Sequence, residues 1–219
     1  MSSLESVQQL LASETFGDRI SGLNQLRAFE PKDAFPLIQP LLKDKEARVR
    51  YAAVSQMDAV GVGFENETLA LLKDALSNDP EIDVKAAAAD AIAGLKITEA
   101  YPDLEAAYHS TTEWLLQFSI VAAIGELGDP RAFDLLKEAL ESETELVRTS
   151  AISALGDLGD RRAIELLTPF VADADWQVRY RVAQAFGRLG GDDLRPYLET
   201  LATDDQAAVA DEAKHHLAK

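Results

Sequence analysis

Aromatic side chains recur at fixed offsets in this chain, and they are its best candidates for binding a partner or a flat ligand. We number each copy of a repeated segment from the first residue of a Val-Arg pair, which is position 0. Trp114 and Phe118 then occupy positions −2 and +2 of one copy, Trp176 and Tyr180 the same positions of another, and Tyr51 position +2 of a third. Residues four apart share one face of a helix.

On a helical wheel this aromatic face lies opposite the apolar stripe, so it is predicted to be exposed. Exposed, rigid aromatic side chains typically anchor a protein partner or stack on a conjugated ligand. Position −2 also lies at the start of a helix, where a tryptophan could instead pack under the preceding turn or against the next repeat. The sequence favours neither interpretation.

A column of basic residues at position +1 could bind an anionic ligand, but a structural role explains it better. Six residues before each member stands a residue that is acidic or typical of a helix cap. The pairs are Asp44 with Arg50, Asp79 with Lys85, Thr111 with Gln117, Ser142 with Arg148, and Asp173 with Arg179. We expect each first member to be an N-cap, and each carboxylate to pair with the neighbouring basic side chain in a ladder along the stack.

Other groups of polar residues do not form a catalytic or metal-binding motif. His215 and His216 are adjacent, so on a helix their side chains diverge by about 100°, and His109 is isolated. The glycine-containing segment 125–128 neither follows a predicted strand nor precedes a lysine, so it does not resemble a phosphate-binding loop. We therefore predict no catalytic residue and no metal site.

The elements that carry these residues repeat every 31 residues. Residues 117–129 align with 148–160 and with 179–191. A period of this length with helical apolar spacing is typical of a solenoid, in which each unit buries its core against its neighbours. About seven units account for residues 1–219, which we treat as one domain. The clearest repeats span 113–204, and the terminal repeats, 1–43 and 205–219, are degenerate.

Each repeat is predicted to contain two helices. Pro130–Leu140 and Arg161–Val171 illustrate the first helix, while Glu145–Leu158 and Asp175–Leu189 illustrate the second. Proline occurs at the same position of two first helices, where we expect it to bend the helix rather than end it. These residues are Pro40 and Pro169.

The second helix has a predicted core stripe at positions 0, +4, +7, +8 and +11. In the fifth repeat these are Val147, Ala151, Ala154, Leu155 and Leu158. Positions −2, +2, +6 and +9 should face outward. In the first repeat, Arg19 and Leu23 are a degenerate copy of positions 0 and +4.

Composition restricts the class of partner. The chain has 219 residues with 38 acidic and 21 basic side chains, a formal charge of −17 and no cysteine. The average surface repels nucleic acid and anionic lipid, and it also disfavours self-association, so we expect a monomer. The lack of cysteine excludes disulfides and thiolate chemistry. No signal peptide or long apolar run is evident, which predicts a cytoplasmic protein.

Several segments resemble the HEAT-like repeats of the phycobilin lyase family of cyanobacteria. The general repeat pattern is carried by ELVR at 145–148, IELL at 164–167 and DWQVRYRVA at 175–183. More specific segments at 16–27, 49–57 and 113–119 resemble the branch of that family that takes part in phycobilisome degradation. The resemblance covers essentially the full chain and implies an all-α, right-handed HEAT-like α-α superhelical solenoid of about seven two-helix repeats.

The resemblance also implies a function. We expect a protein that binds phycobiliproteins, namely phycocyanin or allophycocyanin subunits, and promotes phycobilisome disassembly under nutrient stress at the thylakoid surface. One alternative is a bilin lyase acting on the thioether between chromophore and cysteine, with Asp58 or His109 as the general acid or base. Another is a generic protein-interaction scaffold.

No cofactor is required for this function, but phycocyanobilin is a candidate ligand. Because the chain has no cysteine, it would hold the bilin without a thioether bond. The rings of Trp114, Phe118, Trp176 and Tyr180 could stack on the tetrapyrrole, and Arg181, which lies outside the basic column, could meet a propionate.

Overall fold

The chain divides into two compact units, Met1–Ala123 and Ile124–Lys219, and each is described by itself. The computed structural model describes residues 3–218. The outermost ends of the predicted terminal repeats, residues 1–2 and 219, lie outside the described residues. Residues 3–218 form helices and no β-strand, which confirms the predicted all-α fold. That residues 1–219 form one domain stays a prediction.

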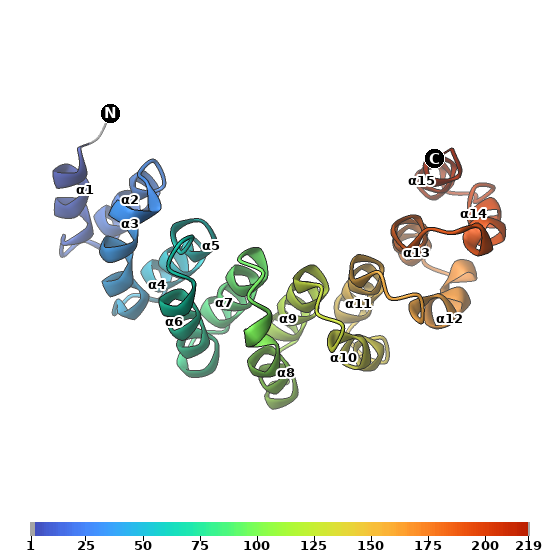
Figure 1. Ribbon diagram of the computed structural model, residues 1–219, viewed down its shortest axis with the longest axis horizontal. Coiled ribbons are helices and arrows are strands. Elements are labelled where there is room, and N and C mark those ends of the chain that lie inside the picture. Colours follow the sequence, from blue (N-terminus) through green and yellow to red (C-terminus); the bar gives the residue numbers. More distant parts are fainter. Residues whose placement is uncertain (1–2, 219) are drawn as a thin grey trace. The chain divides into compact units, whose positions relative to one another are not determined.

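The first unit consists of helices that pack on the next element in the sequence and on the corresponding helices of adjacent repeats (Figure 1). Helix α2 packs against α4, and α4 against α7, while α6 packs against both α7 and α8. The elements are α1 (Leu4–Leu11), α2 (Phe16–Leu26), α3 (Pro31–Ile38), the 3₁₀ helix η1 (Gln39–Lys43), α4 (Ala47–Val54), α5 (Met57–Val60), α6 (Glu65–Asn78), α7 (Ile82–Gly94), η2 (Thr98–Ala100), α8 (Tyr101–Ser110) and α9 (Trp114–Leu127). The boundary between the units falls within α9.

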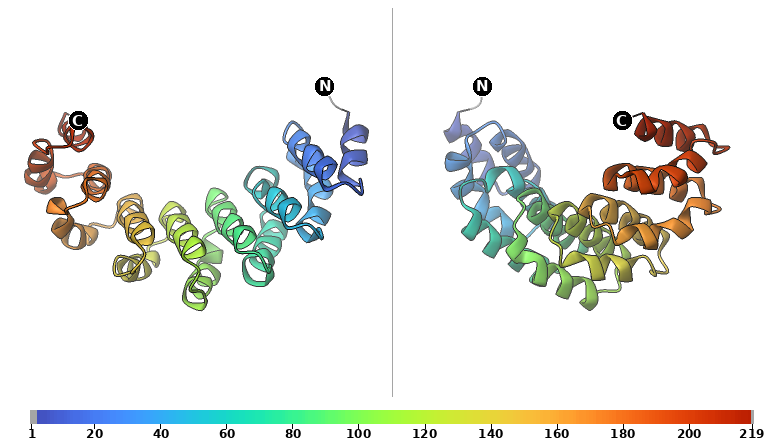
Figure 2. Two further views of the ribbon diagram at one scale, coloured as in Figure 1. Left: turned by 180° about the vertical axis from the view of Figure 1, so that it is seen from behind. Right: turned by 45° about the vertical axis from the view of Figure 1, so that its right-hand side comes forward.

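The second unit has two layers of helices (Figures 1 and 2). One layer holds the second helices of three repeats, α11 (Glu145–Leu158), α13 (Trp176–Leu189) and α15 (Ala207–Leu217). The other layer holds α10 (Ala132–Ala139), α12 (Ala163–Leu167) with η3 (Thr168–Ala172), and η4 (Asp192–Leu194) with α14 (Arg195–Leu201). Over residues 3–218, fourteen of the fifteen α-helices form seven successive pairs, as the repeat predicts, and the short helix α5 lies outside these pairs.

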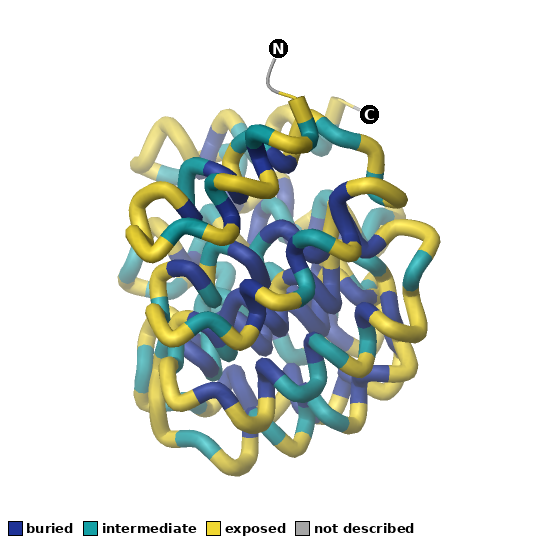
Figure 3. The backbone as a smooth tube through the Cα atoms, turned by 90° about the vertical axis from the view of Figure 1, so that its left-hand side faces the viewer, coloured by how far each residue is buried: buried dark blue, intermediate teal, exposed yellow. Residues whose placement is uncertain are grey.

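The core lies between the layers, and the turns are exposed (Figure 3). The predicted apolar stripe of α11 is confirmed, since its members at positions 0, +4, +7 and +8 are at most 2% exposed. Leu158 at position +11 is half-buried. Burial of such side chains stabilises each repeat only in the presence of its neighbours.

Position +9 is buried in the third, fourth and fifth repeats, contrary to the prediction, whereas Asp58 at this position of the second repeat is exposed as predicted. Gly156 on α11 is buried, and a Cβ atom added to it would lie 2.6 Å from the Cα atom of Ala185 on α13. A Cβ atom added to Gly125 would likewise lie 2.4 Å from the Cβ atom of Ala154 on α11. Position +9 therefore packs against position +7 of the next second helix. A helical wheel represents a single helix, so it does not include the contact between second helices of successive repeats.

The two prolines of the first helices end the α-helix, contrary to the prediction of a bend. Helix α3 ends two residues before Pro40, and α12 ends two residues before Pro169. In both cases the chain continues as a 3₁₀ helix, η1 or η3. A proline ring clashes with the carbonyl group four residues earlier and offers no N–H donor, so α-helical bonding stops there.

None of the helices described in residues 3–218 is long and apolar enough to cross a membrane.

Candidate partner-binding surfaces

The aromatic residues at position −2 are exposed. Trp114 is 47% exposed and Trp176 is 40% exposed. This exposure disfavours the alternative in which the indoles are packed under the preceding turn. Phe118 and Tyr180, at position +2, are half-buried. Each exposed indole is therefore paired, four residues on, with a ring that is partly held by the fold.

The two aromatic pairs belong to different units and are treated as separate surfaces. The α9 surface, Trp114 with Phe118, lies in the first unit. The α13 surface, Trp176 with Tyr180 and Arg181, lies in the second unit. Arg181 is also exposed, and as the residue after Tyr180 it leaves α13 about 100° around the helix from that ring.

Side chains of α13 itself and of the last repeat hold the ring of Tyr180 in the α13 surface. The hydroxyl of Tyr180 lies 3.4 Å from Oε2 of Glu212 on α15, and Nε2 of Gln184 donates to the same hydroxyl over 3.1 Å. Oε1 of Glu212 lies 3.0 Å from Nε2 of His216. The ring is therefore held before a partner arrives, which lowers the entropy lost on binding.

Tyr51 lines a groove of about 370 Å³ between α4 and α7. Tyr51 is 47% exposed. Arg48 contributes a guanidinium to the lining, while Glu81 and Asp83 contribute carboxylates, and Ala47 and Val84 complete it. Carboxylates outnumber cations here, so this groove suits a polar segment of mixed charge better than a dianionic ligand.

The basic column forms a ladder whose geometry differs in part from the prediction. Nε and Nη2 of Arg50 donate to the carboxylate of Asp79 at 2.7 and 2.9 Å, while Nη1 donates to the backbone carbonyl of Asp44 at 3.0 Å. Arg50 thus binds the backbone carbonyl oxygen of the residue six positions earlier, and the carboxylate that it binds belongs to the following repeat. Burial is the largest single influence on the pKa of Asp79 and raises it. The hydrogen bonds from Arg50 and from the backbone N–H of Glu81, together with the nearby positive charges, outweigh burial and lower the pKa of this carboxyl.

The remaining basic residues of the column also bond backbone carbonyl groups. Arg179 donates to the carbonyl of Asp173 at 2.8 Å, Arg148 to that of Ser142 at 2.6 Å, and Lys85 to that of Ser77 at 2.8 Å. The amide of Gln117 donates to the carbonyl of Thr111 at 3.2 Å. An uncharged side chain can occupy this column because a carbonyl is the shared partner.

Four of the five residues predicted to be N-caps are not N-caps, and the role of Thr111 as a cap stays a prediction. The observed caps stand two residues later in the chain than the predicted ones. They are Glu46, Glu81, Thr144 and Asp175, in place of Asp44, Asp79, Ser142 and Asp173. The side chain of each earlier residue accepts a hydrogen bond from the backbone N–H of the true cap, at 2.8 to 3.2 Å. Short polar side chains form such turns as readily as caps, so spacing alone did not distinguish them.

Phe16 is an exposed aromatic residue that the sequence alignment missed. Nε of Arg19 lies 2.7 Å from Oδ2 of Asp44, and Nε of Arg50 lies at the same distance from Oδ2 of Asp79. Because Arg50 occupies position +1, Arg19 occupies position +1 of the first repeat. The sequence alignment had placed Arg19 at position 0. The correction puts Phe16, which is 45% exposed, at position −2 with the two tryptophans. Phe16 stands three residues before Arg19, as Trp176 stands three residues before Arg179, and this shared spacing indicates the equivalence in the sequence.

Comparisons with known proteins assign the observed fold to a known class of repeat proteins. A sequence profile of HEAT repeats matches residues 69–156 and 137–218. A chain of the CpcE–CpcF complex of phycocyanin lyase from Nostoc sp. PCC7120 is similar in structure, with a TM-score of 0.67, 20% identity, and coverage of 99% of this chain and 87% of that chain.

The E. coli protein YibA is similar as well, with a TM-score of 0.70, 20% identity, and coverage of 99% of this chain and 81% of that chain. No curated protein sequence matches significantly. At these identities, the structural similarities show a shared fold of paired helical repeats and do not extend to function.

Proposed function

Because the chain belongs to the family of HEAT-repeat proteins, we propose that it acts by binding, with phycobiliproteins as its partners. In this proposal it is a phycobilisome degradation protein of the NblB type, which docks on phycocyanin or allophycocyanin in the cytoplasm and promotes disassembly of the antenna under nutrient stress. The resemblance of residues 16–27, 49–57 and 113–119 to that branch supports the proposal. The fold shared with a chain of the phycocyanin lyase complex is consistent with it.

The observation that carries the proposal is the exposure of both indoles at position −2. Trp114 and Trp176 leave 47% and 40% of their surface in contact with water. An apolar surface gains free energy when a partner covers it, at about 25 cal/mol per Å². Tryptophan is also among the residues most often responsible for the affinity of an interface. Two such side chains at equivalent positions of the repeat favour a binding function.

The α13 surface also suits an open-chain tetrapyrrole, as an extension of the same proposal. Trp176 and Tyr180 provide aromatic faces, and the exposed guanidinium of Arg181 can pair with a propionate. Phycocyanobilin would be held without a covalent bond, because the chain has no cysteine. In this way the protein would assist bilin detachment from a bound antenna subunit.

Titration of the protein into holo-phycocyanin tests the proposal. We compare the wild type with Trp114→Ala, Trp176→Ala and the double variant, and use Val62→Ala as a control. Val62 is also an exposed apolar residue, at 54%, but it lies in the turn after α5. Each tryptophan variant should weaken binding about tenfold, as truncation of an interface anchor does, while the control stays within about twofold. If the double variant binds like the wild type, the proposal is wrong.

The absorbance of phycocyanin in the same titration separates the alternatives. Binding with an intact red band supports a docking factor, whereas progressive loss of the band with substoichiometric protein would indicate a bilin lyase. The phycocyanin lyase complex among the structural neighbours is the observation that favours this second candidate. An absence of any interaction would leave a generic scaffold.

A further inference from the structure

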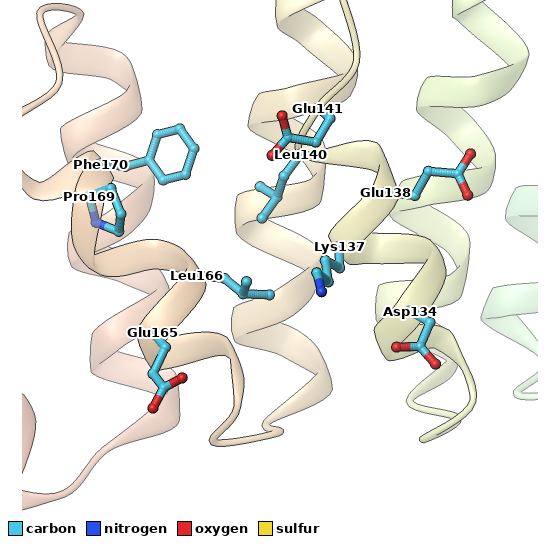
Figure 4. A pocket seen from close by; sticks show the side chains of 9 residues that line it. All are labelled: Asp134, Lys137, Glu138, Leu140, Glu141, Glu165, Leu166, Pro169 and Phe170. Carbon is cyan, nitrogen blue, oxygen red and sulfur yellow. The ribbon is translucent and has the colours of Figure 1, made fainter.

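The second unit has a groove in the layer opposite the α13 surface. It lies between α10 on one side and α12 with η3 on the other, and has a volume of about 640 Å³ (Figure 4). Its lining combines apolar and charged side chains. They are Asp134, Lys137, Glu138, Leu140, Glu141, Glu165, Leu166, Pro169 and Phe170.

Three apolar side chains form the floor of the groove. Leu140 is 5% exposed, while Leu166 and Phe170 are half-buried. Figure 4 shows Leu140 from one wall and Phe170 from the other directed toward the space between the walls. The change from α12 to η3 before Pro169 places Phe170 on this wall. Two of these three side chains, Leu166 and Phe170, are therefore carried by helical elements of one repeat, α12 and η3.

The rim of the groove is acidic. Asp134, Glu138, Glu141 and Glu165 are all exposed, and Lys137 is the one cation among the lining residues. Within residues 3–218, no group of three or more His, Cys, Asp or Glu side chains is arranged to hold a metal ion. The carboxylates are therefore spread along the rim, where they match several separate positive charges better than a single ion.

We propose that this groove binds a basic, amphipathic segment of a partner protein. An apolar side chain of the segment sits on Leu140, Leu166 and Phe170, while flanking lysine or arginine side chains pair with the carboxylates of the rim. Nucleic acid and anionic membranes are excluded as occupants because the rim repels them. The second unit thus has two binding surfaces on opposite layers, and this groove does not depend on phycobiliprotein binding at α13.

Fluorescence anisotropy with two synthetic peptides tests the proposal. The first is a fluorescein-labelled peptide with leucine and phenylalanine between lysines, and the second has the same lysines but serine at each apolar position. The rim variant Glu141→Gln/Glu165→Gln should weaken binding of the first peptide about fivefold, because two exposed charge pairs are lost. The floor variant Leu166→Ser should weaken it about tenfold.

The matched control is Glu143→Gln/Glu145→Gln, which removes the same charge from exposed residues outside the lining. It should bind the first peptide like the wild type. Both carboxylate variants alter only exposed side chains, so they remain informative if Leu166→Ser fails to fold. Equal binding of the two peptides, or equal loss in the rim and control variants, would show attraction by net charge alone and overturn the proposal.

Discussion

Arg179 and Asp204, 25 residues apart in sequence, face each other with two hydrogen bonds between guanidinium and carboxylate. Nε donates to Oδ2 over 2.6 Å, and Nη2 donates to Oδ1 over 2.8 Å. The same arginine donates to the backbone carbonyl of Asp173. One side chain therefore connects the turn before its own helix, α13, to the turn before α15. Bidentate pairs of this kind are stronger and more specific in geometry than single contacts.

Asp204→Asn should lower the free energy of unfolding at pH 7 by about 1–2 kcal/mol, because it removes the charge that faces a nearly buried guanidinium. The side chains of Arg179 and Asp204 are 13% and 8% exposed. The control is Asp205→Asn, whose carboxylate also lies near Arg179, at 3.0 Å, but is 80% exposed. Urea unfolding should show a change below about 0.5 kcal/mol for the control.

The same pair predicts a dependence of stability on pH. The hydrogen bond from Arg179 lowers the pKa of Asp204 from 3.8 to about 2. The folded chain therefore binds fewer protons than the unfolded chain in this range, so the contribution is complete above about pH 4 and is lost as pH falls toward 2. Urea midpoints should fall less steeply with pH in Asp204→Asn than in the wild type. Identical slopes would contradict the assignment.

Arg50→Lys should destabilise the first unit by about 1–3 kcal/mol, since an ammonium cannot reproduce a bidentate pair together with a carbonyl contact. Arg50 and Asp79 are 11% and 7% exposed at the side chain. Arg48→Lys on the same helix is the matched control, because Arg48 is exposed. Thermal unfolding followed by circular dichroism distinguishes them, and equal melting temperatures would argue against a structural role for the ladder.

The repeat made much of this fold predictable from sequence. The core stripe of α11 and the bounds of its helix follow from apolar spacing, because each repeat presents the same face to its neighbours. Spacing also paired Asp44 with Arg50, and the structure joins them through the backbone carbonyl of Asp44. It did not show that the carboxylate binds the arginine of the preceding repeat, Arg19, because that contact depends on how successive repeats are stacked.

The candidate surfaces were partly predictable. The exposed side of α9 and α13 followed from the wheel, but the burial of Gly156 did not, because a wheel has no neighbouring helix. The acidic groove was also not predicted. Its walls come from two successive repeats, and two of its lining residues, Pro169 and Phe170, lie on the 3₁₀ helix η3 that the sequence did not predict.

Gly156→Ala should destabilise the second unit by about 2 kcal/mol, because the added methyl would overlap Ala185 and force α11 and α13 apart. The contact atom is backbone Cα at 2.6 Å, which cannot move by changing a side-chain rotamer. Gly17→Ala is the control, since it also lies within a helix but has no atom closer than 4.0 Å to the new methyl. It should raise stability by about 0.5–1 kcal/mol through helix propensity. Urea unfolding of both variants measures the difference.

Tryptophan fluorescence should report two indoles in contact with water. Trp114→Phe and Trp176→Phe each leave one indole, and both proteins should be quenched by acrylamide nearly as efficiently as the urea-unfolded chain, with little red shift on unfolding. Acrylamide is preferred over iodide because the charge of −17 repels an anionic quencher.

The decisive comparison is the acrylamide quenching of the same two proteins with and without saturating phycocyanin. If the indoles anchor the interface, each should become protected from acrylamide when the partner is bound, since hot-spot side chains lie where water is excluded. Phe16→Ala is the matched aromatic variant, because Phe16 also occupies position −2 and is 45% exposed. Protection of both indoles, together with weaker binding of Phe16→Ala, would show that the interface also includes Phe16. Protection of neither indole would show that these aromatic faces remain in water in the complex, which the proposed docking does not allow.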